Sequence, residues 1–102
     1  MKRSYVMLVM SAAVTLMAVA AQAEVKGDQI FKQKCAMCHA VSGKGGKIGP
    51  ELTKIASSMK ETEIKAKLEN PKKQNPSSSM PSFKTLPKAD MDALLGYLKT
   101  LK

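Results

Sequence analysis

Two cysteines and a histidine stand within five residues of this chain: Cys35, Cys38 and His39. On a helical turn, positions three and four apart share one face, so all three side chains can project to the same side. Two thiols placed in this way can form thioethers with the vinyl groups of a haem, while the adjacent imidazole binds the iron. The C-x-x-C-H spacing therefore predicts covalent haem attachment at Cys35 and Cys38, with His39 as the proximal iron ligand.

Three other uses of a C-x-x-C pair explain the sequence less well. A thioredoxin-like motif lies at the start of a helix in a βαβ setting, and no alternating β-branched segment flanks these cysteines. A structural zinc site needs four ligands, whereas the chain has two cysteines and one histidine in total. A disulfide between Cys35 and Cys38 would close only a very short loop. The haem interpretation is favoured.

The N-terminal residues have the pattern of a secretory signal peptide. A short basic start, Met1-Lys2-Arg3, precedes an apolar segment over residues 6–21, and Ala21-Gln22-Ala23 has the A-x-A form of a cleavage site. An uncleaved membrane anchor is the alternative, but the segment is near the short limit for a span of ~20 residues. We expect a signal peptide over residues 1–23, export to a bacterial periplasm and one domain over 24–102, with no stable membrane association after cleavage.

Composition also favours a domain that needs a cofactor. A protein core of this size is marginal, and a buried haem would add apolar mass to the three aromatic residues that follow residue 23. The 17 basic and 8 acidic residues give a formal net charge of +9, or +7 without Lys2 and Arg3. The lysines are spread along the chain without interleaved aromatics or arginine clusters. Nucleic acid is therefore not an expected partner.

Periodicity and turn residues predict an all-α domain with about four helices around one haem. We expect helices over about 27–39, 52–57, 58–70 and 88–101, and no convincing strand pair. Glycines between residues 43 and 49 mark a loop. Ser58 with Glu61 fits a capping box for the third helix, and Pro71 ends that helix. Apolar residues recur at helical spacing along the last helix: Met91, Leu94, Leu95, Leu98 and Leu101.

The sixth position of the iron needs a ligand other than a second histidine, which leaves methionine, lysine or a terminal amine. Met37 lies between the attachment cysteines and cannot reach the opposite haem face. Met59 and Met91 are at helical spacing with other apolar residues, which favours a place in the core. Met80 lies in the proline-rich segment 71–87, and a loop can place its thioether across the haem. Met80 is therefore the favoured distal ligand, with Met59 as the alternative.

Together these features resemble the class I cytochrome c family in its small bacterial single-haem form. The resemblance covers residues 27–101 and rests on several matches besides the C-x-x-C-H motif: Gly27 with Phe31, Gly49-Pro50-Glu51-Leu52, Met80-Pro81 and Leu94-x-x-Tyr97. It implies that the first and last helices cross near the glycine and the aromatic pair. It also implies that the Pro50 carbonyl accepts a hydrogen bond from the proximal His39, and that Met80 is the distal ligand.

One departure from the family concerns the haem propionates. Many members bind them with arginine or tryptophan, and residues 24–102 contain neither. Lysines, backbone amides or hydroxyl groups such as those of Ser57, Ser58 and Tyr97 would have to replace them. Lysine is a point charge without the planar fork of arginine.

The ligand set predicts the chemistry. His39 and Met80 would fill both axial positions and leave no open site for a substrate, and thioether ligation with burial favours the ferrous state. We expect a monomeric periplasmic electron carrier, not an enzyme, with one covalent haem c. Its expected partners are redox proteins with acidic docking patches, which Lys44 and Lys47 would meet near the haem crevice. A fixed haem subunit of a larger oxidoreductase, and a ligand sensor or weak peroxidase, are the alternatives.

Overall fold

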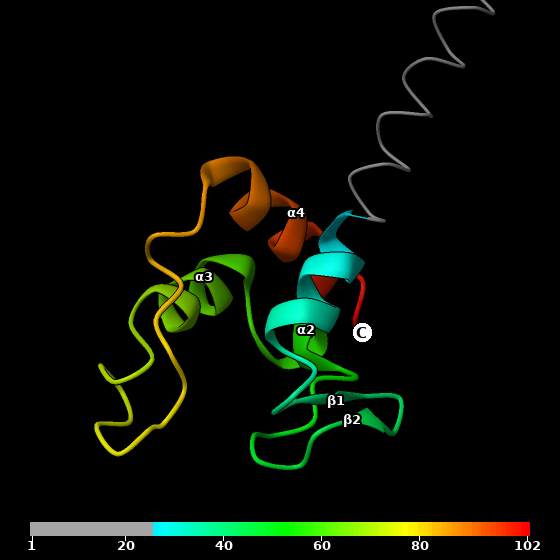
Figure 1. Ribbon diagram of the computed structural model, residues 1–102, viewed down its shortest axis with the longest axis horizontal. Helices are drawn as coiled ribbons and strands as arrows, with labels where there is room; N and C mark the ends of the chain where they lie inside the picture. The colour runs from blue at the N-terminus through cyan, green and yellow to red at the C-terminus, as the bar shows by residue number, and fades with distance from the viewer. Residues whose placement is uncertain (1–25) are drawn as a thin grey trace, which may run out of the picture.

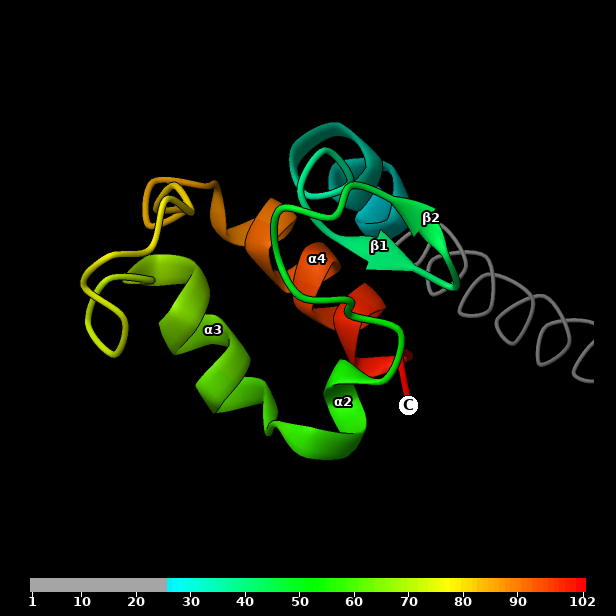
Figure 2. The ribbon, with the colours of Figure 1, turned by 90° about the horizontal axis from the view of Figure 1, so that it is seen from below.

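The computed structural model describes residues 26–102, so the expected signal peptide lies outside the described residues. In order, the chain forms a helix at residues 26–34, β1 (Ala40–Val41), β2 (Lys44–Gly45), α2 (Ile55–Ser58), α3 (Glu61–Glu69) and α4 (Lys88–Lys99). Helix α4 lies between the N-terminal helix and α3, as Figures 1 and 2 show. The prediction of an all-α domain with four helices is confirmed. Within residues 26–102, no helix is long and apolar enough to cross a bilayer.

The core forms where one apolar face of each longer helix meets the others. Leu94 of α4 is completely buried at its centre. The remaining buried apolar residues are Ile30, Phe31 and Cys35, then Ile64 and Leu68, and Met91, Ala93, Leu95 and Leu98. Full burial of one such aliphatic side chain stabilises the fold by about 1.5–3 kcal/mol. The apolar stripe predicted for the last helix is therefore confirmed, although α4 ends at Lys99 and Leu101 lies beyond it, half-buried.

The N-terminal helix crosses α4 at Gly27. A Cβ atom at this position would overlap the carbonyl oxygen of Ala93 and the Cβ of Tyr97, so only glycine permits so close an approach. One turn later the ring of Phe31 lies against that of Tyr97, with 5.3 Å between centroids and 52° between ring planes. Tilted aromatic pairs of this kind add about 0.5–1.5 kcal/mol to the effect of burial.

The first helix ends earlier than the sequence predicts. It ends at residue 34, and residues 35–38 form hydrogen-bonded turns. The N–H groups of Cys38 and His39 both donate to the carbonyl oxygen of Cys35, at 3.1 and 2.9 Å. The C-x-x-C-H residues therefore still share one turn of helical character, but that turn follows the helix.

A short β-hairpin stands where the sequence predicted only a loop. Strands β1 and β2 pair antiparallel, with Ala40 opposite Gly45. The connecting residues Ser42 and Gly43 both have positive φ, 52° and 77°, as a type I′ turn requires. The expectation of no strand pair was wrong because this turn, and not an alternating apolar pattern, makes the hairpin.

The boundaries of α2 and α3 also differ from the prediction. Helix α2 begins at Ile55, three residues later than expected, and α3 begins at Glu61 without a side-chain cap. The predicted capping box was wrong, because the Ser58 hydroxyl donates instead to the Ile55 carbonyl within α2. The end of α3 is as predicted: Asn70, before Pro71, leaves helical geometry with φ −142° and ψ 77°.

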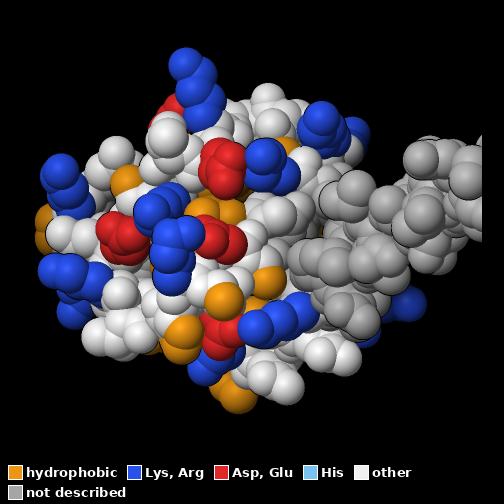
Figure 3. Space-filling view, turned by 90° about the horizontal axis from the view of Figure 1, so that it is seen from above, with side chains coloured by type: hydrophobic (Ala, Val, Ile, Leu, Met, Phe, Trp, Pro, Cys, Tyr) orange, Lys and Arg blue, Asp and Glu red, His pale blue; other side chains and the backbone are white. Residues whose placement is uncertain are grey.

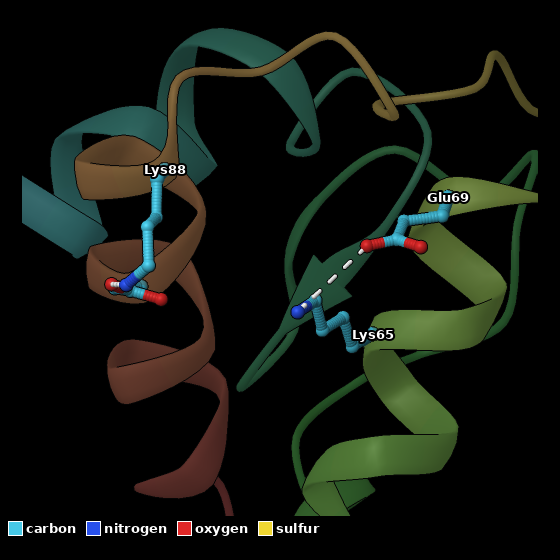
Figure 4. Close-up of polar contacts among 4 residues, drawn as sticks. Lys65, Glu69 and Lys88 are labelled. Carbon is cyan, nitrogen blue, oxygen red and sulfur yellow. Dashed lines mark hydrogen bonds and ion pairs between the residues drawn. The ribbon is translucent and has the colours of Figure 1, made fainter.

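Acidic side chains on the helices are largely paired with lysines. Within residues 26–102 the ion pairs are Lys26–Asp90, Lys32–Asp28, Lys65–Glu69, Lys88–Asp92 and Lys99–Glu61. Figure 4 shows the Lys65–Glu69 contact on α3 and Lys88 of α4 with its carboxylate partner. Figure 3 shows acidic groups interleaved with lysines over one face. Exposed pairs contribute little to stability, about 0–1 kcal/mol each, but they neutralise these faces.

Candidate haem site

Two adjoining cavities, of about 240 and 300 Å³, form one crevice in the molecule. Five residues line both of them: His39, Pro50, Asn75, Ser78 and Met80. Because these residues are shared, they mark where the two cavities meet. The larger of the two reaches the lower end of the ~300–1,000 Å³ range of ligand and cofactor pockets.

The larger cavity is lined by the two cysteines and the histidine of the C-x-x-C-H motif. Cys35, Cys38 and His39 line it together, so the structure brings the predicted attachment residues to one wall. Both cysteines are free thiols; Cys35 is buried and Cys38 is half-buried. The arrangement leaves two thiols available on the same wall for covalent attachment.

The environment of Cys35 argues against a thiol redox motif. Burial raises the pKa of its thiol to about 11, the neighbouring Cys38 adds to that rise, and Lys34 partly offsets it. A thiol that exchanges with disulfides needs a pKa lowered towards neutrality, so that the thiolate forms. Cys35 has the opposite setting, and the thioredoxin-like alternative loses support.

The orientation of the His39 ring is fixed from the Gly49-Pro50 segment. The Nδ1–H group of His39 donates to the carbonyl oxygen of Pro50 at 2.7 Å. A carbonyl can only accept, so Nδ1 carries the hydrogen and Nε2 keeps its lone pair. Gly49 packs so closely against the ring that a Cβ atom at this position would overlap the ring atoms. The imidazole is therefore held with Nε2 available for a metal.

Met80 reaches the crevice from the loop between α3 and α4. This loop is attached to the end of α3, because the Phe83 N–H donates to the Leu68 carbonyl at 2.7 Å and the Ser82 hydroxyl donates to the Glu69 carbonyl. Figures 1 and 2 show it on the far side of the molecule from the β1–β2 hairpin. Met80 lines both cavities together with His39, whereas Met59 lines only the smaller one.

The smaller cavity is mainly apolar but includes one cation that the sequence did not reveal. Its aliphatic lining comes from Leu52, Ile55, Ile64, Leu68 and Leu98. Lys67 also lines it, and Lys34 lines the larger cavity. The spacing of Lys67 from the buried Ile64, one helical turn, was a signal that this exposed lysine borders the inner face of α3.

Several residues singled out from the sequence do not line the crevice. Lys44 and Lys47, expected near it, line neither cavity. The same holds for Ser57, Ser58 and Tyr97, the hydroxyl groups considered for the propionates. Besides Lys34 and Lys67, the loop between α3 and α4 supplies uncharged polar side chains to the lining: Gln74, Asn75, Ser77, Ser78 and Ser79.

Comparison with known proteins identifies the family. Residues 24–102 match the sequence model of the family described as Cytochrome c. The chain belongs to the cytochrome c family. A cytochrome c from Gibberella zeae is 38% identical, in an alignment that covers 72% of this chain and 90% of the fungal protein. Cytochrome c oxidase subunit 2 of Alkalihalophilus pseudofirmus is 31% identical over 76% of this chain, which spans only 25% of that subunit.

A solved structure confirms the fold. The c-type cytochrome SorU from Sinorhizobium meliloti superposes with a TM-score of 0.59 at 21% sequence identity, covering 79% of this chain and 92% of that one. The chain is thus a class I c-type cytochrome with the small cytochrome c fold, an electron-transfer protein with covalently bound haem c. The crevice fits this group, with two thiols on one wall, an imidazole nitrogen available and a largely aliphatic lining.

Proposed function

We propose that this cytochrome is a periplasmic electron carrier with His39 and Met80 as axial ligands and thioether bonds at Cys35 and Cys38. The observation that carries the proposal is the shared lining of the crevice: His39 and Met80 both border the junction of the two cavities. The haem would supply a reversible one-electron Fe(II)/Fe(III) couple. Residues 1–23 are the proposed signal peptide, and residues 24–102 the mature domain.

Each residue has a defined part in this proposal. Pro50 holds the His39 ring by the 2.7 Å hydrogen bond, which keeps the imidazole oriented in both oxidation states. The Met80 thioether is a soft ligand that favours ferrous iron, and the aliphatic lining of the smaller cavity disfavours the extra charge of the ferric state. His39 and Met80 would together hold the iron from both sides and leave no position for a substrate, so the protein would transfer electrons without turnover of its own.

The proposal can be tested on protein exported to the periplasm. The intact mass should equal residues 24–102 plus one haem, and the reduced protein should not bind carbon monoxide at neutral pH. The variant with Cys35→Ala and Cys38→Ala should retain no covalent haem and lose most of its helical circular dichroism, because the small core depends on the cofactor. A mass that includes residues 1–23, or haem that acid acetone extracts, would contradict the proposal. Rapid carbon monoxide binding would favour a ligand sensor or weak peroxidase.

A second candidate function follows from the oxidase relative. In that subunit a segment similar to this chain makes up about a quarter of the length. The same domain could therefore act here as a fixed haem subunit of a larger oxidoreductase. A stoichiometric complex that survives purification would support this role, whereas a monomer that reacts with second-order kinetics supports the free carrier.

A further inference from the structure

Two side chains from the segment that follows the β-hairpin hold the turn of that hairpin. The N–H of Ser42 donates to the hydroxyl oxygen of Thr53 at 2.8 Å, and the N–H of Gly43 donates to the carboxylate oxygen Oε1 of Glu51 at 3.3 Å. The Thr53 hydroxyl donates in turn to the same carboxylate oxygen at 2.9 Å. The four groups form one connected network. We call Glu51 and Thr53 the turn clamp.

The geometry of the turn explains why it needs these acceptors. Ser42 has a φ of 52°, in the left-handed region that residues other than glycine rarely adopt, and Gly43 follows with a φ of 77°. Because the ladder pairs residues 40–41 with residues 44–45, the N–H groups of Ser42 and Gly43 lie outside it. The turn clamp supplies an acceptor to each of them and thereby fixes the hairpin turn to residues 51–53.

Glu51 is also bonded directly to the group that holds the His39 ring. The Pro50 carbonyl, which accepts the hydrogen bond from Nδ1 of His39, belongs to the peptide unit that joins Pro50 to Glu51. A peptide unit is planar, so its carbonyl can turn only if the residues at its two ends turn with it. Anchoring the Glu51 side chain therefore restricts the direction of the Pro50 carbonyl.

Backbone hydrogen bonds tie the same segment to both sides of His39. The N–H of Gly49 donates to the carbonyl of Cys38, the residue before His39, at 2.7 Å. The N–H of Leu52 donates to the carbonyl of Ala40, the residue after His39, at 2.8 Å. These bonds set where the segment lies, and the turn clamp holds its far end against the hairpin. The imidazole and its acceptor are thus carried by one unit.

We propose that Glu51 and Thr53 are positioning residues, which hold the Pro50 carbonyl against Nδ1 of His39 and so help to set the midpoint potential. The inference rests on the proposed function, in which His39 is an axial ligand. A firmly held hydrogen bond at Nδ1 makes the imidazole a more basic ligand. A more basic ligand stabilises ferric iron over ferrous iron. Loss of the turn clamp therefore weakens the hydrogen bond and raises the potential.

The main test is Thr53→Val in the holoprotein, because valine matches threonine in shape and leaves the charge unchanged. We expect the Nδ1–H of His39 to exchange with solvent about 5-fold faster in the ferrous protein, followed by NMR, which is the ratio expected for the loss of one net hydrogen bond. The midpoint potential should rise in spectroelectrochemical titration, and Thr53→Ser should restore both values. Thr100→Val is the matched control, since the Thr100 hydroxyl donates to the Tyr97 carbonyl at 2.6 Å and lines neither cavity.

A second pair of variants separates the hydrogen bonds of Glu51 from its charge. Glu51→Gln and Glu51→Ala both remove the negative charge, so both should raise the potential at low salt. Glutamine keeps an oxygen that can accept from Gly43 and Thr53, whereas alanine does not. The potential and the exchange rate should therefore be higher in Glu51→Ala than in Glu51→Gln. This difference should persist at high salt, where long-range charge effects are screened. The pair carries the test if Thr53→Val does not fold.

Three outcomes would overturn the inference. The first is a Thr53→Val protein with a lower urea midpoint but the potential and the exchange rate of the wild type, which is a structural role alone. The second is an equal change in Thr100→Val, and the third is one common potential for Glu51→Gln and Glu51→Ala. A wild-type ferrous protein without haem-shifted NMR signals from His39 and Met80 would instead overturn the proposed function, and this inference with it.

Discussion

The Nδ1–H group of His39 donates a hydrogen bond to the carbonyl oxygen of Pro50, with 2.7 Å between nitrogen and oxygen, and Gly49 packs closely against the same ring. The two contacts come from adjacent residues of one loop. The amide of Gly49 is itself fixed by its hydrogen bond to the Cys38 carbonyl, at 2.7 Å. The loop and the C-x-x-C-H turn therefore position each other, and together they fix the orientation of the His39 ring.

Gly49→Ala tests this arrangement. The new Cβ would overlap Cε1 and Nδ1 of the His39 ring, so the ring has to tilt and the hydrogen bond to Pro50 weakens. Overpacking of this kind costs about 1–3 kcal/mol, and we expect a lower guanidinium midpoint in unfolding followed at the Soret band. Gly96→Ala in α4 is the control, because a Cβ there meets nothing within 4 Å. Equal destabilisation of both variants would show that Gly49 has no special role.

Met80→Ala and Met59→Ala distinguish the two candidate distal ligands. We expect Met80→Ala to abolish the weak charge-transfer band of sulfur bound to ferric haem, to lower the potential and to admit exogenous ligands. Met59 is half-buried and lines only the smaller cavity, so its loss should lower stability by less than the ~2–5 kcal/mol of a fully buried methionine, while the band remains. Absorption and cyanide-binding spectra of the ferric proteins decide the matter. The reverse pattern would assign the ligand to Met59.

Local patterns explain what the sequence could predict. The periodicity of α4 identified its buried face, which includes Leu94 and Leu98. The C-x-x-C-H spacing and the surrounding family matches predicted covalent haem c and the cytochrome c fold, and the comparisons confirm both. The assignment of His39 and Met80 to the iron stays a prediction, because family membership does not identify the ligands of an individual chain.

The errors arose where backbone geometry or tertiary position decides the outcome. The hairpin depends on positive φ at Ser42 and Gly43. Its strands have only two residues each, which is too short for an alternating pattern to show in the sequence. The capping box failed because the Ser58 hydroxyl found a nearer acceptor in α2. Lys67 was overlooked because helical spacing shows which residues share a face, but not that this face of α3 borders a cavity.

Stability at alkaline pH should depend on Tyr97. Burial raises the pKa of its phenol, the nearby Asp28 adds to the rise and Lys32 partly offsets it. The folded protein therefore favours the neutral phenol more than the unfolded chain does. The resulting stability is complete below the ordinary tyrosine pKa of about 10 and is lost as pH rises through the raised value.

Tyr97→Phe isolates this effect, because it keeps the ring that packs on Phe31 and removes the titrating group. Denaturation curves at pH 7 should differ little between the two proteins, whereas above about pH 10 the wild type should lose stability more steeply. Lysine titration affects both proteins alike. Parallel pH profiles would rule out a contribution from the phenol.

The last prediction concerns the potential and Lys67, an exposed lysine whose side chain borders the smaller cavity. Its charge opposes the extra positive charge of ferric iron, and if it pairs with a propionate it also neutralises a group that would favour the ferric state. Both effects raise the midpoint potential, so Lys67→Gln should lower it, on the order of tens of millivolts in a partly screened crevice. Lys65→Gln is the matched control on the same helix, since Lys65 is also exposed but contacts Glu69 and lines neither cavity.

Spectroelectrochemical titration between pH 5 and pH 9 separates the two contributions. If Lys67 pairs with a propionate, its removal raises the pKa of that acid. The potential of Lys67→Gln would then become pH-dependent where that of the wild type is flat. A uniform decrease at all pH values indicates the charge effect alone. An unchanged or higher potential, or an equal decrease in Lys65→Gln, would show that Lys67 does not act on the haem.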